Sequence, residues 1–420
     1  MKGDFSRITF DPKKHYSRVL MQQGRVQLDA DWNEQAAIVL HRLETMARDL
    51  IGPFGGPVNN CGFEFKPNKT DGKLFQLGEG RYYVDGMLCV NDEATKHSIV
   101  ALFEQDAVSD QDTDYLLYLD VWEQYLNASE DPEIRETALG GPDTSGRSKV
   151  VWSVRTLAYT LQGDIPKAVA GVLTALQLEQ ENNGRLNVTV EDRTGHEPDD
   201  GPCISSPDAR FRGLENQLYR VEIHNGDSKS STFKWSRENG SVIFPITARE
   251  GASMVLEPGY STMGLKSGDW VELVDDDLTA GAKLGPLQQV KSVDAVKREI
   301  RLTTEMSHAV DPKKHPFLRR WESGVISIEE GKEFPLEDGI RIQFVKAAGS
   351  VKVTYRSGDY WCFPARTAGK GNIAWPPGGA PPDGVIHHYA PLAAISYVPG
   401  GTLTLVSDCR KIFHGLAVPK

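Results

Sequence analysis

The run DYLLYLDVWEQYL, residues 114–126, decides the fold class, because it is long, rich in aromatic and branched side chains, and free of Gly and Pro. Such runs are typical of β-strands. A second run of the same character, KVVWSVRTLAYTL, occupies residues 149–161, and the sequence between the two has loop composition with one potential helical turn. The two runs predict a pair of long strands, and with them a protein built mainly from β-structure.

One helix and one hairpin precede these strands. Over residues 31–50 the apolar side chains recur at steps of three and four, and the sequence GPFGGP then ends the pattern, which predicts an amphipathic helix. Residues 80–91 hold two short apolar runs around Asp85-Gly86, a dipeptide that favours a tight hairpin turn because Gly tolerates positive φ. We therefore expect residues 1–162 to form a first unit, in which the helix packs on a small sheet.

Downstream of the long strands the pattern changes twice. Residues 163–212 carry a second apolar periodicity, which predicts a helix over residues 166–180, and then a polar stretch that we expect to be a linker or extended arm. Residues 213–420 alternate like paired strands, and the short strands at about 260–306 are typical of a small SH3- or OB-like barrel. The expected fold class is mainly β (α+β), with an N-terminal helix on a small sheet followed by β-sandwich or barrel domains.

The composition excludes several classes of protein. The 420 residues carry a net charge of −11, which opposes binding to phosphate backbones, so no nucleic-acid partner is expected. No run of about 18 apolar residues could span a membrane, and the N-terminus has no apolar signal region. We expect synthesis in the cytoplasm and no membrane insertion. The five cysteines are scattered, which fits reduced thiols better than a zinc site or a disulfide framework.

The predicted helix begins in a cluster of acidic and amide side chains, DADWNE, which has two interpretations. Asp29, Asp31 and Asn33 match the first three ligand positions of an EF-hand calcium loop. The match then fails, because Glu34 stands where the loop needs Gly and Leu40 where it needs a bidentate Glu. The alternative, which we favour, is a helix start in which Asp31 is the N-cap and Glu34 completes a capping box.

The sequence predicts no catalytic residue and no cofactor. It holds no nucleophile-elbow, zinc-protease, phosphate-loop or dinucleotide-binding motif in a supporting context. Asp275, Asp276 and Asp277 could coordinate a cation, but three successive aspartates before a Gly loop are more often a solvated turn. His224, at an expected strand end that runs into a turn, is more often structural than catalytic, and it would matter together with these aspartates if the protein were an enzymatic cargo.

Aromatic residues near strand ends could form a partner-binding or sugar-binding surface. FKWSRENGSV and GDYWCFPAR combine Trp, Arg and turn residues, and rigid rings beside Arg make good contact anchors. The side chains concerned are Trp235, Trp321, Tyr360 and Trp361. The alternative, which we favour, is that they are core aromatics of a β domain with Arg stems packed over them.

Several motifs resemble one family. HYSRVLMQQGRVQLDADWNEQ resembles the N-terminal signature of an uncharacterised bacterial domain family encoded near contractile injection systems and phage-tail-like particles. Further stretches similar to that family extend the resemblance from residue 3 to residue 398, namely FKWSRENGSV, LRRWE, LEDGIRIQF, GDYWCFPARTAGKGNIAWP and HHYAPLA. The N-terminal part is also similar to phage tail-fibre and baseplate-attachment proteins, in which this region docks the appendage to the baseplate, often as an oligomer.

The resemblance implies a non-enzymatic structural or adaptor protein of an injection particle, which could be released from the cell. Its partners would be baseplate, tube or sheath components, with homo-oligomerisation as an option. Relatives carry receptor-facing modules after this region and this chain does not, so we expect the attachment or scaffold portion. The residues expected at a first and a second interface are Arg25, Asp31, Trp32, Glu34, Trp235, Arg237, Trp361 and Arg366. The alternatives are a cargo or effector protein loaded in the particle, and a carbohydrate-binding module.

Overall fold

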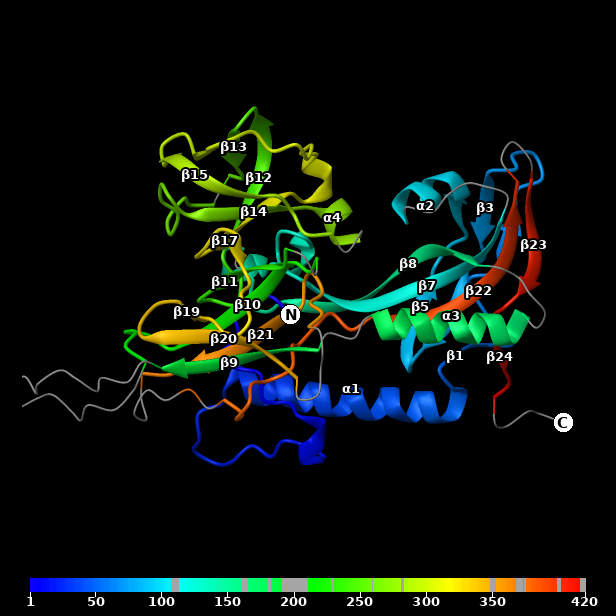
Figure 1. The fold of residues 1–420 in the computed structure, drawn as a ribbon, viewed down its shortest axis with the longest axis horizontal. Coiled ribbons are helices and arrows are strands. Elements are labelled where there is room, and N and C mark those ends of the chain that lie inside the picture. Colours follow the sequence, from blue (N-terminus) through cyan, green and yellow to red (C-terminus); the bar gives the residue numbers. More distant parts are fainter. Residues whose placement is uncertain are drawn as a thin grey trace, which may run out of the picture.

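The structure, a computed structural model, is mainly β, and an N-terminal helix precedes several β-sheets (Figure 1), as the sequence predicts. It describes residues 1–106, 113–141, 143–159, 165–179, 183–190, 211–227, 230–258, 260–280, 283–347, 353–367, 373, 375–398 and 402–415. Within these ranges the buried apolar residues gather in three large cores and a smaller one. None of the helices in these ranges is both long and apolar enough to cross a membrane.

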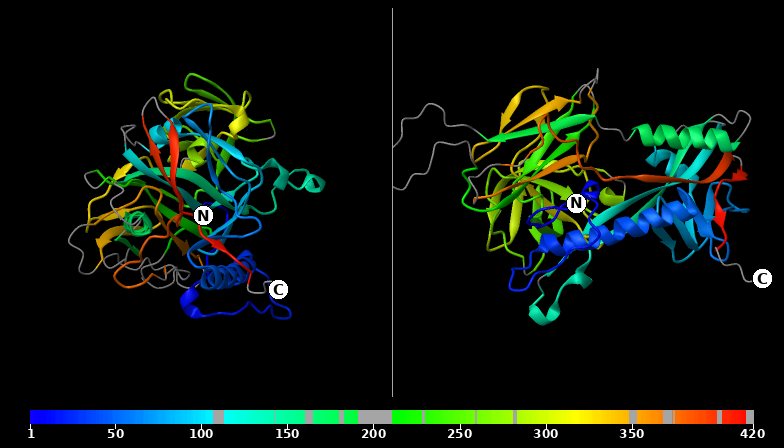
Figure 2. Two further views of the ribbon diagram at one scale, coloured as in Figure 1. Left: turned by 90° about the vertical axis from the view of Figure 1, so that its right-hand side faces the viewer. Right: turned by 90° about the horizontal axis from the view of Figure 1, so that it is seen from below.

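A central sheet contains the two long strands predicted from the sequence, β7 (Thr113–Leu126) and β8 (Arg147–Tyr159), which pair antiparallel along nearly their whole length. The second neighbour of β7 comes from the far end of the chain. β22 (His388–Tyr397) pairs antiparallel with β7, and β23 (Leu403–Asp408) pairs with β22. The end of the chain therefore completes a sheet that its first half begins, as the red strands among the cyan ones show in Figure 2.

Both faces of the central sheet are covered, which explains why β7 reads as a continuous apolar run. On one face α3 (Ile165–Glu179) packs its Val169 and Leu176 against Leu116 and Tyr118 of β7. The other face meets α2 (Ile99–Gln105) and two small sheets. The first small sheet consists of β24 (Ile412–Phe413), β1 (Phe54–Pro57), β4 (Gly80–Val84) and β5 (Met87–Asn91). The second consists of β2 (Phe65–Pro67), β3 (Leu74–Leu77) and β6 (Thr95–Ser98).

The long helix α1 (Asp29–Ile51) lies along the lower edge of the molecule in Figure 1. The predicted β4–β5 turn holds it there: Asp85 and Gly86 both have positive φ, and a Cβ at Gly86 would overlap the backbone oxygen of Glu44. Arg48 pairs with Asp85 at 2.6 Å. Only Ala30 and Ile38 of α1 are fully buried, so the helix rests on the sheet by a narrow stripe.

A β-sandwich of two sheets forms the next assembly. Its first sheet contains β18 (Ile326–Ser327), β11 (Thr232–Ser236), β10 (Gln217–Asn225) and β21 (Tyr360–Ala365). Its second sheet contains β19 (Glu333–Pro335), β20 (Ile340–Lys346) and β9 (Gly184–Val190). The core between the two sheets is rich in aromatic rings, with Phe233, Phe344 and Trp361 in edge or tilted contact.

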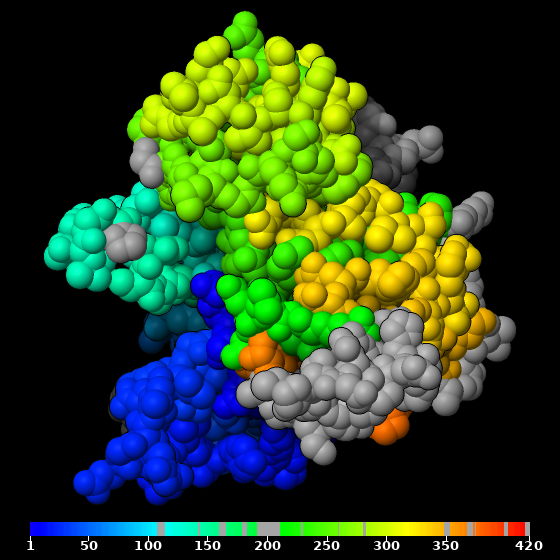
Figure 3. Space-filling model, turned by 90° about the vertical axis from the view of Figure 1, so that its left-hand side faces the viewer, coloured from blue at the N-terminus to red at the C-terminus, as the bar shows by residue number. Residues whose placement is uncertain are grey.

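A closed barrel of six strands sits on the sandwich, at the top of Figures 1 and 3. Its strands are β12 (Ile243–Glu250), β13 (Ser253–Leu256), β14 (Trp270–Val274), β15 (Leu287–Asp294), β16 (Glu299–Leu302) and β17 (Phe317–Trp321). A short helix, α4 (Asp276–Ala280), follows β14. Four 3₁₀ turns complete the described elements: η1 (Pro12–Lys14), η2 (Pro132–Ile134), η3 (Thr137–Leu139) and η4 (Pro312–Lys314).

The barrel spans more residues than the expected range 260–306, which contains only β14, β15 and β16. Three strands leave two unpaired edges, and β12, β13 and β17 satisfy those edges by closing the ring. The barrel therefore begins at Ile243 and ends at Trp321.

The expected boundaries at residues 162 and 212 do not coincide with the sheets, because strands distant in sequence pair with one another. β9 lies inside the expected linker, yet it pairs antiparallel with β20 of the sandwich. β22, β23 and β24 lie inside the expected C-terminal unit, yet they pair in the sheets of the first unit. Residues 191–210 of the expected linker lie outside the described residues.

The pairing of β22 with β7 predicts that stability depends on the end of the chain. Ile395→Ala should cost about 2–5 kcal/mol, because Ile395 is fully buried in the core beneath the central sheet. The matched control is Leu405→Ala on β23, whose side chain lies opposite Ile395 in the register and is 43% exposed. It should cost less than about 1 kcal/mol. Urea-unfolding midpoints followed by Trp fluorescence compare the two; equal losses would contradict this packing.

Candidate functional site

A segment that we call the N-terminal arm, residues 15–28, lies on the surface with every side chain except Val19 exposed. It contains neither helix nor strand. Its exposed large apolar side chains are Tyr16, Leu20, Met21, Val26 and Leu28. In Figure 3 the blue part of the chain, which includes the arm and α1, projects at the lower left of the molecule. Exposed apolar surface of this kind typically marks an interaction site.

Polar side chains at the start of α1 hold the arm and the segment before it in place. Gln35 accepts a hydrogen bond from the backbone N–H of Val19 at 2.7 Å. Asp29 accepts one from the backbone N–H of Ser6 at 2.8 Å. Although burial alone would raise the pKa of Asp29, its hydrogen bonds with Ser6 lower that pKa below the ordinary value. The acidic cluster thus binds the chain's own backbone, and the arm is presented on a fixed support.

The expected N-cap at Asp31 is wrong, because α1 already begins at Asp29. Leu28 occupies the cap position without a side-chain hydrogen bond, and the carboxylate of Asp31 reaches back to the backbone N–H of Leu28 at 3.4 Å. Glu34 accepts a hydrogen bond from the hydroxyl of Thr9 at 2.7 Å. Both side chains thus support the segment that precedes the helix. The sequence did not reveal this start, because Leu is a poor cap residue and both Asp29 and Asp31 are better ones.

Of the four residues expected at the first interface, Arg25 and Trp32 are exposed, while Asp31 and Glu34 are half-buried. The 61% exposed Trp32 stands where the arm meets α1. The structure therefore leaves Arg25 and Trp32 available to a partner, while Asp31 and Glu34 hold the segment before the helix.

The second expected interface is not a surface. Trp235 and Trp361 both lie opposite Val221 in the strand register and point with it into the sandwich core, where they are 7% and 1% exposed. The alternative favoured from the sequence, core aromatics, is confirmed for these two and for Trp321 and Tyr360.

The two arginines expected beside those rings are tied down by other parts of the chain. Arg237 pairs with Glu337 at 2.7 Å. Arg366 donates a hydrogen bond to the backbone oxygen of Ser6 at 2.7 Å, which fastens the N-terminal segment to the sandwich.

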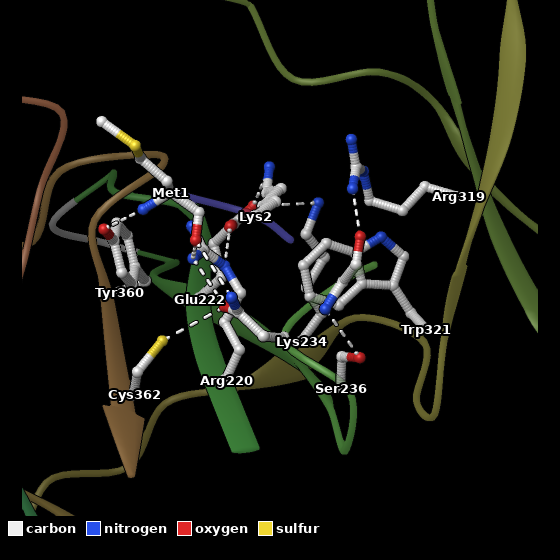
Figure 4. A network of polar contacts seen from close by, with 12 residues as sticks. Met1, Lys2, Arg220, Glu222, Lys234, Ser236, Arg319, Trp321, Tyr360 and Cys362 are labelled. Carbon is white, nitrogen blue, oxygen red and sulfur yellow. Dashed lines mark hydrogen bonds and ion pairs between the residues drawn. The ribbon is translucent and has the colours of Figure 1, made fainter. Parts of the chain in front are cut away.

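A buried polar network joins the sandwich to the barrel (Figure 4). At its centre the ammonium of Lys234, on β11, lies 2.8 Å from a carboxylate oxygen of Glu272 on β14 and 3.4 Å from one of Glu222 on β10. The indole N–H of Trp321 donates to Glu272 at 2.8 Å, and the Lys234 ammonium lies 4.3 Å from the centre of the Trp321 ring. Arg220 pairs with Glu222 at 2.7 Å.

The cations of this network favour the ionised form of its two carboxylates. Burial alone would raise the pKa of Glu222, but Lys2, Arg220 and Lys234 outweigh it and hold that pKa far below the ordinary value. Burial also opposes ionisation of Glu272, and Lys234 with Lys2 again leaves its pKa lowered. Both carboxylates are therefore ionised at neutral pH.

The first three residues of the chain contact this network. Lys2 pairs with Glu222 at 3.1 Å, and burial lowers the pKa of Lys2 to about 8. Asn239 donates hydrogen bonds to the backbone oxygens of Met1 and Gly3 at 3.1 and 2.9 Å. Because Glu222, Lys234 and Glu272 are all within about 2% of full burial, no solute reaches them, and the network is a structural junction between sheets.

An open groove of about 570 Å³ lies at one end of the junction. Its lining includes His224, at the end of β10, together with Ser307 and His308. His308 lies 2.6 Å from the carboxylate of Asp275, whose side chain is 2% exposed. The Nδ1 atom of His224 is buried and has no hydrogen-bond partner among the described residues. Burial and the nearby Lys234 lower the pKa of His224.

The groove brings together residues that the sequence kept apart. His224 was expected to be structural, and His308 was not identified, because the loop that carries it has no motif. The three aspartates considered for a cation diverge: Asp275 faces His308, Asp276 lies 2.9 Å from His315, and Asp277 pairs with Lys314. In the described part of the chain no three His, Cys, Asp or Glu side chains gather closely enough to hold a metal ion.

Comparison with known proteins identifies the family. The model of a family of unknown function (DUF6519) matches residues 1–194 and 186–396. Because these matches cover most of the chain, the protein belongs to this family. No curated protein and no solved structure matches the sequence. The family's description assigns no activity, so the function has to be inferred from the molecule itself.

The buried junction predicts a large cost for removing its central cation. Lys234→Met should destabilise the protein by about 3–5 kcal/mol, because it leaves Glu272 buried without a counter-ion. The lowered pKa values of Glu222 and Glu272 mean that their contribution is full above pH ~4.5 and is lost as the pH falls through the folded-state values. Acid unfolding, followed by circular dichroism, should therefore move to higher pH in the Lys234→Met variant.

Two further variants control this experiment. Lys332→Met removes a cation whose ion pair with Glu329 is more than half exposed, and it should change stability by less than about 0.5 kcal/mol. The double variant Lys234→Met, Glu272→Gln also removes the buried negative charge. It should recover part of the free energy of unfolding that Lys234→Met loses. If Lys234→Met costs no more than Lys332→Met, the junction does not hold the sheets together.

Proposed function

We propose that the protein is a non-enzymatic structural or adaptor component of a phage-tail-like contractile injection particle, and that the N-terminal arm is its docking element. The observation that carries the proposal is the exposure of the arm's apolar side chains on a fixed support, in the same stretch that resembles tail-fibre and baseplate-attachment proteins. An apolar surface that is held rigidly loses little conformational entropy on binding, which favours association.

The arm suits a protein partner with an apolar groove or an unpaired strand. Val26 and Leu20 are 84% and 69% exposed, and covering a side chain of this size contributes about 1.5–3 kcal/mol. Because the arm forms no strand of its own, its backbone can add to the edge of a partner's sheet. Baseplate, tube or sheath proteins are the partners proposed; Arg25 lies within the arm and Trp32 in the first turn of α1.

The remaining assemblies fit an adaptor role because they are joined rigidly. The Lys234 junction fixes the barrel on the sandwich, and Arg366 fastens the sandwich to the segment before the arm. A force on the docking element therefore moves the sandwich and the barrel together with it. In this proposal the barrel and sandwich supply stiffness and a second surface.

A cargo or effector role is the second candidate, and the His308 groove favours it. A histidine held by a buried carboxylate beside a serine is an arrangement that can transfer protons. Asp275→Asn should abolish toxicity of the protein in a target cell, while the exposed Asp277→Asn should not. If the wild-type protein is not toxic, the effector role is wrong. It is also wrong if the Asp275→Asn and Asp277→Asn variants are equally toxic.

The docking proposal predicts that the arm is needed for attachment. Particles purified from a producing strain that lacks this gene are mixed with the protein, and the co-sedimenting fraction is measured. Leu20→Asp with Val26→Asp should reduce that fraction at least about tenfold, because each change places a charge in an apolar contact.

The matched control is Val296→Asp, on the barrel, where the valine is 94% exposed but lies far from the arm in sequence. It should co-sediment as wild type does. Circular dichroism must show that all variants are folded. If the wild-type protein does not co-sediment, or if both sets of variants behave alike, the arm is not a docking element.

A further inference from the structure

One face of α1 carries an apolar stripe that is turned to solvent. The apolar residues recur at alternating steps of four and three, and they are Trp32, Ala36, Val39, Leu43, Met46 and Leu50. All six are exposed, the five large ones between 46% and 63%. None of them belongs to a core cluster in the described part of the chain. The view from below in Figure 2 shows the length of the helix in front of the molecule.

The opposite face of α1 is the one that holds the helix to the body. Ile38 is 1% exposed, Glu34 binds Thr9, and Arg48 binds Asp85. The stripe is therefore a second apolar face, and it does not serve the fold of a single chain.

The spacing of the stripe is that of a coiled coil. Apolar residues that recur every 3.5 residues keep one seam of a helix facing a partner helix, where each side chain inserts between four of the other. A helix that only covers a globular core needs a broader face with a period of 3.6. The period over residues 32–50 thus favours a second helix as the occupant of the stripe.

We propose that α1 pairs antiparallel with α1 of a second copy of this chain, about a two-fold axis. In this arrangement Leu43 faces Met46 of the second copy, and Leu50 faces its Val39, each pair occurring twice. Leu40, which is 42% exposed, lies at the edge of the seam against Ala47 of the other helix. The same stripe thus fills both sides of the contact, as a two-fold interface requires.

Charge complementarity selects the antiparallel direction. Arg42 and Asp49 flank the stripe on one side, both are exposed, and neither makes an ion pair with a described residue. With the helices antiparallel, Arg42 of each copy lies beside Asp49 of the other, which gives two opposite-charge pairs at the edges of the seam. With the helices parallel, Arg42 lies beside Ala47 and finds no opposite charge.

The size of the contact sets the expected affinity. Four apolar layers cover less than the ~800 Å² per partner of a standard stable interface. We expect a dissociation constant on the order of tens of micromolar. The paired part of the stripe, from Val39 to Leu50, lies on the C-terminal half of α1, and the arm precedes α1. Pairing therefore leaves both arms free and is independent of docking to a particle.

Sedimentation equilibrium of the full chain tests the pairing over about 1–300 µM, which brackets that dissociation constant about tenfold on either side. The wild-type mass should rise from 46.4 kDa towards twice that value. Leu43→Asp should abolish the rise. Leu178→Asp, on α3, replaces a leucine that is 57% exposed on another helix and should leave the rise unchanged. A monomeric wild type, or a dimer that survives Leu43→Asp, overturns the proposal.

Charge exchange tests the direction. Arg42→Asp alone and Asp49→Arg alone each place like charges together twice, and each should weaken the dimer at least about tenfold. Mixing the two single variants should restore it as a heterodimer, since Asp at position 42 of one chain then meets Arg at position 49 of the other. If the single variants dimerise as wild type does, or if mixing restores nothing, the antiparallel register is wrong. Failure here leaves the particle-binding experiment unaffected.

Discussion

The ammonium of Lys234 is the point on which the rest of the architecture depends, because it is fully buried between carboxylates of two different assemblies. Glu222 belongs to the sandwich, where Arg220 and Lys2 also pair with it, and Glu272 belongs to the barrel, where Lys234 is the cation that compensates its burial. A buried ion pair adds little net free energy compared with an apolar contact of the same size. Its effect is to penalise every arrangement in which the barrel is shifted or rotated, since any such movement leaves a charge buried alone.

The junction also explains the unusual pattern of strands β10 and β11. Their apolar positions, such as Val221 and Trp235, face the aromatic core of the sandwich. Their charged positions are buried on the opposite face, where Arg220 contacts the first residue of the chain and Lys234 contacts the barrel. The two strands thus separate an apolar core from a charged one, and both faces are dry.

This arrangement marks the limit of what the sequence could reveal. Local features were predictable, since the Asp85-Gly86 turn, the helix over residues 31–50 and the strands at 114–126 and 149–161 depend on nearby residues. Alternation of polar and apolar residues was visible in FKWS, but alternation shows only that two faces differ, not that the polar face is exposed. A strand's sequence does not identify its partner, so the pairing of β22 with β7 and the full extent of the barrel required the three-dimensional structure. The same holds for the position of His224 and His308 in one groove.

The pairing of β7 with a strand from the end of the chain has a consequence for biosynthesis. When β7 and β8 leave the ribosome, one edge of β7 and the apolar side chains beneath it have no partner, because residues 388–397 have not yet been made. At about 5–20 residues per second, synthesis of the sandwich and barrel keeps that edge open for tens of seconds. An open edge of this length invites pairing with other nascent chains. The order of the strands along the gene therefore makes the first assembly the last to close, and it makes protection of the nascent chain part of the protein's folding problem.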